Sequence, residues 1–183
     1  IAYNNIDDGW DLYSRIENGP IGAAEISYCL GSRNGRNLAK TLQADGNGFK
    51  LGGEGIPIPH RLRHSLAVEN DVDGITSNSN PALILENSVS AASGGRNFAV
   101  YGQGEEASAA KASECLSAEG TLPDLLPAPW GEEEVRESSK SAKRLLAEWR
   151  RAFVEKFPEE KAWLDQSLAR MQAEQEASES KKI

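Results

Sequence analysis

The sequence lacks the features that define several common protein classes. Its 183 residues include two cysteines, Cys29 and Cys115, which are too few for the disulfide framework of a small secreted domain. No CxxC pair is present, and only His60 and His64 could join the cysteines at a zinc ion, so the residue types argue against a zinc site. No apolar run approaches the roughly 20 residues that a membrane-spanning helix needs.

The chain is also short of positive charge. It carries 20 lysines and arginines against 28 acidic residues, a net charge of −8 and a pI of about 4.9. Such a chain repels phosphate groups, so we expect no nucleic acid and no membrane among its partners.

Glycine and asparagine are unevenly distributed. Fifteen of the 17 glycines and all 11 asparagines lie in residues 1–104, whereas residues 105–183 are rich in charge. Two kinds of structure therefore share the chain. We expect β coils over 1–104, a connector with a short helix over 105–130, and a helical segment over 131–183.

The first part contains a repeat. Three stretches open with a polar turn residue, a glycine and a large apolar residue: Asp8-Gly9-Trp10, Asn47-Gly48-Phe49 and Asp73-Gly74-Ile75. Their glycines are 39 and 26 residues apart, and each opening is followed by a segment with period-two alternation. The spacings are unequal, but both lie inside the range for stacked repeats.

Like residues fall into columns when the alternating segments are superimposed. Alternation places Ile26, Tyr28 and Leu30 on one face of the first segment. The superimposed columns are Ile26/Leu62/Leu85, Leu30/Leu66/Val89 and Cys29/Ser65/Ser88. These columns favour an all-β fold, a right-handed parallel β-helix of about three coils, and a helical segment after it. The alternative is a small antiparallel sandwich with Gly/Asn hairpins.

The particular residues in these coils are more informative than the period of the repeat. The run Asp7–Tyr13 with Gly19–Gly22 resembles the calcium-site coil of the pectate lyases of polysaccharide lyase family nine, and the run Gly46–Pro57 (GNGFKLGGEGIP) resembles the coil that carries that family's catalytic lysine. The run His60–Ser90 resembles the next two coils of the family. The resemblance covers about residues 1–104.

The resemblance implies a secreted enzyme that cleaves pectate (polygalacturonate) by β-elimination with calcium. It places Asp7, Asp8 and Asp11 on calcium-binding aspartates and Lys50 on the Brønsted base. The family's site also uses an aspartate from an earlier coil, for which this chain has no counterpart. Because the chain starts at Ile1 without a methionine or a signal peptide, we expect a processed product or a fragment truncated at its N-terminus.

The chemistry explains why these residue types are needed. The reaction removes a proton beside a sugar carboxylate, so negative charge builds up, and a calcium ion with oxygen ligands offsets that charge. The base has to be a neutral amine. Because Phe49 and Leu51 should point inward, Lys50 should project outward, and stacking of Trp10 on Phe49 would place Asp11 beside Lys50.

Other residues leave alternatives open. The aspartates of DDGWD could form a plain turn. Arg36, Arg61 and Arg63 could bind uronate carboxylates as bidentate partners or be ordinary surface charges. We expect His60 and His64 to be loop and strand positions and not catalytic groups.

The C-terminal part shows helical periodicity without recognisable chemistry. Leu145, Trp149 and Phe153 recur at spacing four and predict a helix over Ser138–Phe157. Pro158 should break it, and a second helix should run over Glu159–Ala177. The pair could form a hairpin that caps the β-helix or lies along its flank, and a disordered linker is the alternative.

Three functions are therefore open. The first is a calcium-dependent pectate lyase with Lys50 as base. The second is a degenerate or carbohydrate-binding β-helix without turnover, and the third is a lyase acting on another acidic polysaccharide. The sequence alone leaves the oligomeric state undetermined.

Overall fold

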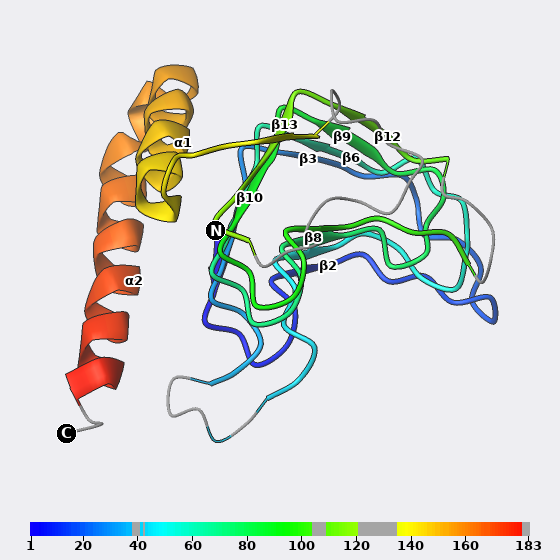
Figure 1. The fold of residues 1–183 in the computed structure, drawn as a ribbon, viewed down its shortest axis with the longest axis horizontal. Coiled ribbons are helices and arrows are strands. Elements are labelled where there is room, and N and C mark those ends of the chain that lie inside the picture. Colours follow the sequence, from blue (N-terminus) through cyan, green and yellow to red (C-terminus); the bar gives the residue numbers. More distant parts are fainter. Residues whose placement is uncertain (38–40, 42, 104–108, 121–134, 181–183) are drawn as a thin grey trace.

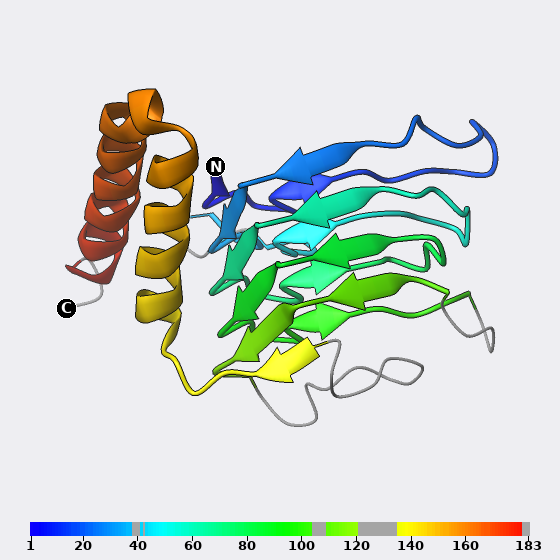
Figure 2. The same cartoon turned by 90° about the horizontal axis from the view of Figure 1, so that it is seen from above.

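The chain winds into stacked coils with three parallel sheets (Figures 1 and 2). A computed structural model describes residues 1–37, 41, 43–103, 109–120 and 135–180. Within these residues every pair of named strands is parallel. Sheet I has the order β1-β4-β7-β10-β13-β14, sheet II the order β2-β5-β8-β11, and sheet III the order β3-β6-β9-β12.

The strands are short, as expected where a coil turns from one sheet to the next. Sheet I consists of β1 (Ala2–Tyr3), β4 (Leu30–Ser32), β7 (Leu66–Val68), β10 (Val89–Ala91), β13 (Cys115–Ala118) and β14 (Val135–Glu137). Sheet II consists of β2 (Trp10–Asp11), β5 (Phe49–Lys50), β8 (Ile75–Thr76) and β11 (Phe98–Ala99). Sheet III consists of β3 (Glu25–Ser27), β6 (Arg61–Arg63), β9 (Ile84–Glu86) and β12 (Lys111–Ser113).

The register between coils follows the predicted columns. Ile26 pairs with Leu62, which pairs with Leu85, and Leu30 pairs with Leu66, which pairs with Val89. The interior between the sheets is filled by a cluster that includes Phe49, Leu62, Ile75, Leu85 and Phe98, all fully buried. The predicted parallel β-helix is confirmed and the antiparallel sandwich is wrong.

The expectation that Ile26, Tyr28 and Leu30 share a face is wrong. Tyr28 has a φ of 55°, in the left-handed region, and the turn at this residue separates β3 from β4. Ile26 therefore packs into the interior, while Leu30 belongs to a second cluster on the outer face of sheet I. The Tyr28 ring, left at the corner, stacks on His64 with centroids 4.8 Å apart.

The column of small side chains after this corner is confirmed. The Cys29 amide donates a hydrogen bond to Ser65 Oγ at 3.1 Å, and the Ser65 amide donates to Ser88 Oγ at 3.5 Å. Cys115 continues the column on the next coil, and both cysteines are free thiols. Burial raises the pKa of the Cys115 thiol to about 11, so this thiol is neutral and unreactive at ordinary pH.

An asparagine ladder supports a second corner. Asn5 Nδ2 donates to Asn34 Oδ1 at 2.9 Å, and Asn34 Nδ2 donates to Asn70 Oδ1 at 2.9 Å. Arg33 precedes Asn34 and Glu69 precedes Asn70, and their φ values are 53° and 56°. The ladder satisfies polar groups that these left-handed turns bury between coils.

The β-helix extends one coil beyond the three that the sequence predicted. Lys111–Ser113 and Cys115–Ala118 form β12 and β13, so the described part of the predicted connector is strand and not short helix. The absence of glycine and proline from these residues permits a helix locally, but pairing with β9 and β10 prevails. Residues 121–130 of that predicted connector lie outside the described residues. The division into domains at 104 and 130 stays a prediction.

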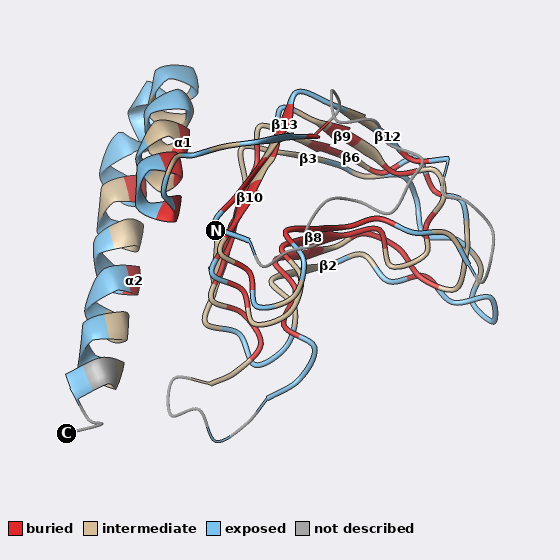
Figure 3. Ribbon diagram, viewed as in Figure 1, coloured by how far each residue is buried: buried red, intermediate tan, exposed pale blue. Residues whose placement is uncertain are grey.

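Two helices cover sheet I from outside (Figures 1 and 3). They are α1 (Ala142–Lys156) and α2 (Lys161–Ser180), and the 3-10 turn Pro158–Glu160 separates them where Pro158 ends the first helix. Leu145 and Trp149 pack with Leu30 and Leu66 of the sheet. The helices therefore form the predicted hairpin, along the flank of the β-helix. No described helix combines the length and apolar character needed to cross a membrane.

The hairpin is attached to coils at both ends of the stack. Glu119, just after β13, accepts a hydrogen bond from the Ala142 amide at the start of α1. On the first coil, Asn4 Nδ2 donates to Glu174 Oε2 of α2 at 3.1 Å. Arg33 Nη1 donates to the Met171 carbonyl oxygen at 3.4 Å. The helices therefore bridge the first and later coils.

His60 is fully buried between the coils of β3 and β6. Its Nδ1 accepts a hydrogen bond from the Ala24 amide at 3.1 Å, so the proton of the neutral ring lies on Nε2, which has no partner among the described residues. Burial lowers the pKa of His60, because the charged ring would lose its hydration. The histidine is thus a structural contact between coils.

We expect His60 to make stability depend on pH. Because its pKa is lower in the fold than in the unfolded chain, its contribution is complete above the ordinary histidine pKa of about 6.5. That contribution is lost as the pH falls below 6.5 toward the folded value. Urea unfolding of the wild type and His60→Gln from pH 7.5 to 5 should show a smaller acid loss in the variant. Identical pH profiles would contradict this.

We expect Trp149 to carry much of the hairpin's packing. Trp149→Ala should lower the free energy of unfolding by about 3–5 kcal/mol, because the side chain is 7% exposed and would leave a cavity. The control is Trp163→Ala in α2, whose side chain is 48% exposed and whose removal should cost about 1 kcal/mol or less. Equal losses by urea denaturation would show that the hairpin is not docked through Trp149.

Candidate functional site

The register of β2 and β5 brings an aspartate and a lysine together on the outer face of sheet II. Trp10 pairs with Phe49, and their rings stack with centroids 6.2 Å apart. Asp11 pairs with Lys50 at the next position, where alternation points both side chains outward. Lys50 Nζ lies 3.7 Å from Asp11 Oδ2. The predicted juxtaposition of these two residues is therefore present.

The turn before β2 supplies a buried carboxylate. The Asp8 side chain is 1% exposed, and its Oδ2 lies 3.0 Å from Lys50 Nζ. Its Oδ1 accepts hydrogen bonds from the Asn47 amide at 2.8 Å and from Asn47 Nδ2 at 2.7 Å. Three donors therefore hold Asp8 in place and stabilise its charge.

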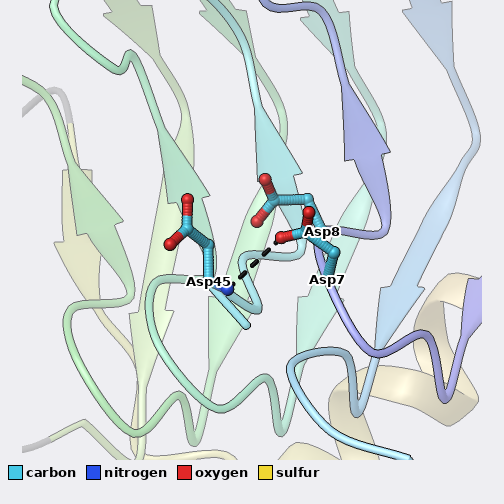
Figure 4. A group of neighbouring side chains, drawn as sticks. All are labelled: Asp7, Asp8 and Asp45. Carbon is cyan, nitrogen blue, oxygen red and sulfur yellow. Dashed lines mark hydrogen bonds between the residues drawn. The ribbon is translucent and has the colours of Figure 1, made fainter. Parts of the chain in front are cut away.

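Asp7 and Asp45 complete an acidic group around Asp8 (Figure 4). Asp45 lies in the segment that leads to β5, and its amide donates to Asp7 Oδ1 at 3.2 Å. Asp7, Asp8 and Asp45 each offer one carboxylate oxygen, and these oxygens lie within 4.8 Å of one another. Asp45 Oδ2 also lies 3.3 Å from Lys50 Nζ. We call Asp7, Asp8, Asp11 and Asp45 the aspartate cluster.

The aspartate cluster determines the charge state of Lys50. Burial alone would lower the pKa of Lys50, but the hydrogen bond and charge of Asp8, with the smaller effects of Asp11 and Asp45, raise it above its ordinary value. Burial raises the pKa of Asp11, against the attraction of Lys50, and the charges of Asp8 and Asp7 raise it further. The ammonium of Lys50 is thus the cation that offsets the cluster in this structure.

The cluster has the donor set of a calcium site. Calcium binds six to eight oxygens at about 2.3–2.6 Å, so two oxygens on one ion are at most about 5 Å apart. The 4.8 Å limit among Asp7, Asp8 and Asp45 meets this condition, and carboxylate oxygens are the ligands that a hard cation prefers. These residues fit a calcium ion, with further ligands left to water or substrate.

The three predicted arginines lie elsewhere and are paired. Arg61 and Arg63, on sheet III, lie 3.5 and 3.0 Å from Glu86 Oε2. Arg63 also contacts Glu25, at 2.9 Å. Arg36 forms a hydrogen-bonded ion pair with Asp71. The structure thus brings together Asp7, Asp8, Asp11 and Lys50, and it does not add the arginines to them.

Two residues of this region escaped the sequence analysis. Asp45 precedes the second coil opening, and the only available signal was its place beside Gly46, before the strand that carries Lys50. Tyr13 lies two residues after Asp11 and therefore on the same outer face. Lys50 Nζ is 5.2 Å from the centroid of its ring.

Comparisons with known proteins identify relatives of the β coils. The family model described as Pel9A-like, right-handed β-helix region matches residues 1–113. Pectate lyase L of Paenibacillus polymyxa (strain SC2) is 44% identical over 127 residues, which is 68% of this chain and 27% of that protein. Pectate lyase L of Thermoclostridium stercorarium is 46% identical over 90 residues, 49% of this chain and 7% of that protein.

Two further matches are a curated protein and a solved structure. Pectate disaccharide-lyase of Dickeya chrysanthemi is 40% identical over 89 residues, 48% of this chain and 10% of that protein. The crystal structure of pectate lyase Pel9A matches at a TM-score of 0.49 and 26% identity, covering 76% of this chain and 32% of that one. The chain spans about a quarter or less of the length of the curated relatives named here. The matching family model confirms the right-handed winding.

We expect Lys50 to stabilise the cluster in the absence of metal. Lys50→Met should lower the free energy of unfolding in a chelator by about 2–3 kcal/mol, because it leaves the buried Asp8 without its cation. Calcium should recover part of this loss through mass action. Urea denaturation with and without calcium measures both effects. The control is Lys161→Met, which removes a pair with Asp165 on the surface of α2 and should respond to neither. An equal loss in calcium and chelator would contradict the expectation.

Proposed function

Because the chain belongs to the Pel9A-like right-handed β-helix family, we propose that it is a calcium-dependent lyase that cleaves pectate (polygalacturonate) by β-elimination. The observation that carries the proposal is the placement of Lys50 between Asp8 and Asp11 of the preceding coil and Asp45 of its own coil, on the outer side of sheet II. Extracellular action, which the resemblance implies, is part of the same proposal.

Lys50 is the proposed base. Its Nζ takes the proton from carbon 5 of the uronate, a double bond forms between carbons 4 and 5, and the bond from carbon 4 to the glycosidic oxygen breaks. The departing oxygen acquires a proton from solvent. Lys50 projects outward from β5, and the glycines that follow, Gly52 and Gly53, are packed against Asn80 and the Tyr13 ring respectively.

Asp7, Asp8, Asp11 and Asp45 are the proposed calcium ligands. These residues would hold the ion, which would supply the positive charge that offsets the uronate carboxylate during proton removal. The buried Asp8 is held by Asn47, which keeps its oxygens directed at the cluster. Aspartates that ligate a divalent cation would attract the ammonium of Lys50 less strongly. The neutral amine, which has to accept the proton, would then be more favoured than in the metal-free site.

The proposed substrate contacts of the three arginines depend on an exchange of ion-pair partners. Arg36, Arg61 and Arg63 bind substrate only if a uronate carboxylate replaces the acidic partner that each has in the fold. Such an exchange of one carboxylate for another would leave the net charge of each ion pair unchanged, and bidentate geometry would favour it.

Binding without turnover is the second candidate. It is favoured by the ion pairs that Lys50 makes with its carboxylate neighbours, since a protonated lysine attracts a uronate but does not act as a base. A lyase that acts on another uronan is the third.

The proposal is tested by incubating the protein with polygalacturonate and calcium at alkaline pH and measuring the ultraviolet absorbance of the unsaturated product. We expect product, its loss in a chelator, and a fall of about 10²- to 10⁴-fold in rate for Lys50→Ala. The control is Lys111→Ala, which removes an exposed lysine of β12 and should keep the activity.

Binding measurements and product assays together separate the alternatives. Calorimetry should show calcium binding that Asp8→Asn and Asp45→Asn each weaken. Calcium-independent binding of pectate without product would support the second candidate. Product from a different uronan alone would support the third.

A further inference from the structure

Two exposed tyrosines flank the candidate site on the outer face of sheet II. The register aligns Asp11 with Lys50, Thr76 and Ala99 on successive coils. The positions two residues later form the next aligned column along the coils. The members of this column are Tyr13, Gly52, Asn78 and Tyr101. The tyrosine side chains are 37% and 38% exposed, and they stand on the first and last of the four coils.

Tyr13 leans from its own coil toward the coil of Lys50. A Cβ added to Gly53 would lie 2.4 Å from Cε2 of the Tyr13 ring, so the ring lies directly against this glycine. The Tyr13 hydroxyl donates to Glu54 Oε1 at 3.2 Å, and Glu54 Oε2 accepts from the Ile16 amide at 2.6 Å. The ring is therefore fixed beside Lys50 while part of its surface faces solvent.

Tyr101 leans in the opposite direction. Its hydroxyl donates to Asn78 Oδ1 at 3.2 Å, one coil nearer the candidate site. Asn78 Nδ2 in turn donates to the Gly52 carbonyl oxygen at 2.8 Å. Asn78 thus links the Tyr101 hydroxyl to the backbone of Gly52, on the coil that carries Lys50.

We propose that Tyr13 and Tyr101 are sugar-binding residues at the two ends of an oligosaccharide path across sheet II, with Lys50 beside it. The proposal rests on the proposed function, because it assigns the path to the acidic polysaccharide acted on at Lys50. Aromatic rings pack against the C–H faces of pyranose rings, while hydroxyl and amide groups at their edges bond the sugar hydroxyls.

The spacing of the two tyrosines suits an oligosaccharide better than a single sugar. Strands on neighbouring coils are about 4.8 Å apart, so the two tyrosine positions are about 14 Å apart along the stack. That distance accommodates several sugar residues. Lys50 Nζ lies 5.2 Å from the Tyr13 ring centroid, so a sugar residue packed on this ring would lie beside the proposed base.

The test uses a galacturonate pentamer with Tyr13→Leu, Tyr101→Leu, Tyr13→Phe and the control Trp163→Leu, which removes an exposed aromatic side chain from α2. Calorimetry in chelator and in calcium gives Kd, and initial rates of product formation give KM and kcat. Circular dichroism establishes that each variant melts near the wild-type temperature. We expect each leucine variant to raise Kd and KM about tenfold with a smaller change in kcat. Tyr13→Phe and Trp163→Leu should stay within about twofold of the wild type.

Several results would overturn the inference. A fall in kcat with unchanged KM in Tyr13→Leu would mean that the ring acts only through Lys50. An equal loss in Tyr13→Phe would assign the effect to the hydrogen bond with Glu54, and an equal loss in Trp163→Leu would make it non-specific.

The outcomes also separate this inference from the proposed function. Tyrosine-dependent binding without product supports the path and overturns the lyase. Product that is unaffected by the leucine substitutions supports the lyase and overturns the path. No product and no heat with the pentamer in either medium overturn both.

Discussion

The in-register stacking of β2 on β5 is the constraint on which the site depends. Trp10 and Phe49 occupy equivalent positions on neighbouring coils, and their stacked rings leave one register in which both pack into the interior cluster. A slip of one residue would exchange the inner and outer faces of a strand. The apolar interior thereby sets the positions of Asp11 and Lys50 without taking part in any chemistry.

Electrostatics then adds a constraint of its own. The carboxylates of Asp8, Asp11 and Asp45 lie within ion-pair distance of one ammonium, and the most buried of them, Asp8, is also the one with the most hydrogen-bond donors. Such a group is balanced only when a cation lies among the carboxylates. Lys50 fills this place here, and a divalent ion would compete for the same oxygens. The function and the stability of the site therefore depend on the same few contacts.

Much of the architecture could be predicted, since columns of like residues determine register. Ile26, Leu62 and Leu85 pair as expected, and so do Asp11 and Lys50. The turn at Tyr28 could not be predicted from alternation, because a positive φ at a tyrosine has no signature in the period. Asp45 was missed because its proximity to Asp7 arises from the path of the segment before β5, which no strand pattern describes.

The helical hairpin bears on how the molecule unfolds. A stack of coils is nearly one-dimensional, because each coil contacts its neighbours alone, and such a stack can fray from its ends one coil at a time. The hairpin contacts Asn4 and Arg33 near one end and Glu119 near the other. A terminal coil cannot detach without also losing its contacts to a rigid element shared with distant coils. The hairpin thus turns a linear array into a single cooperative unit.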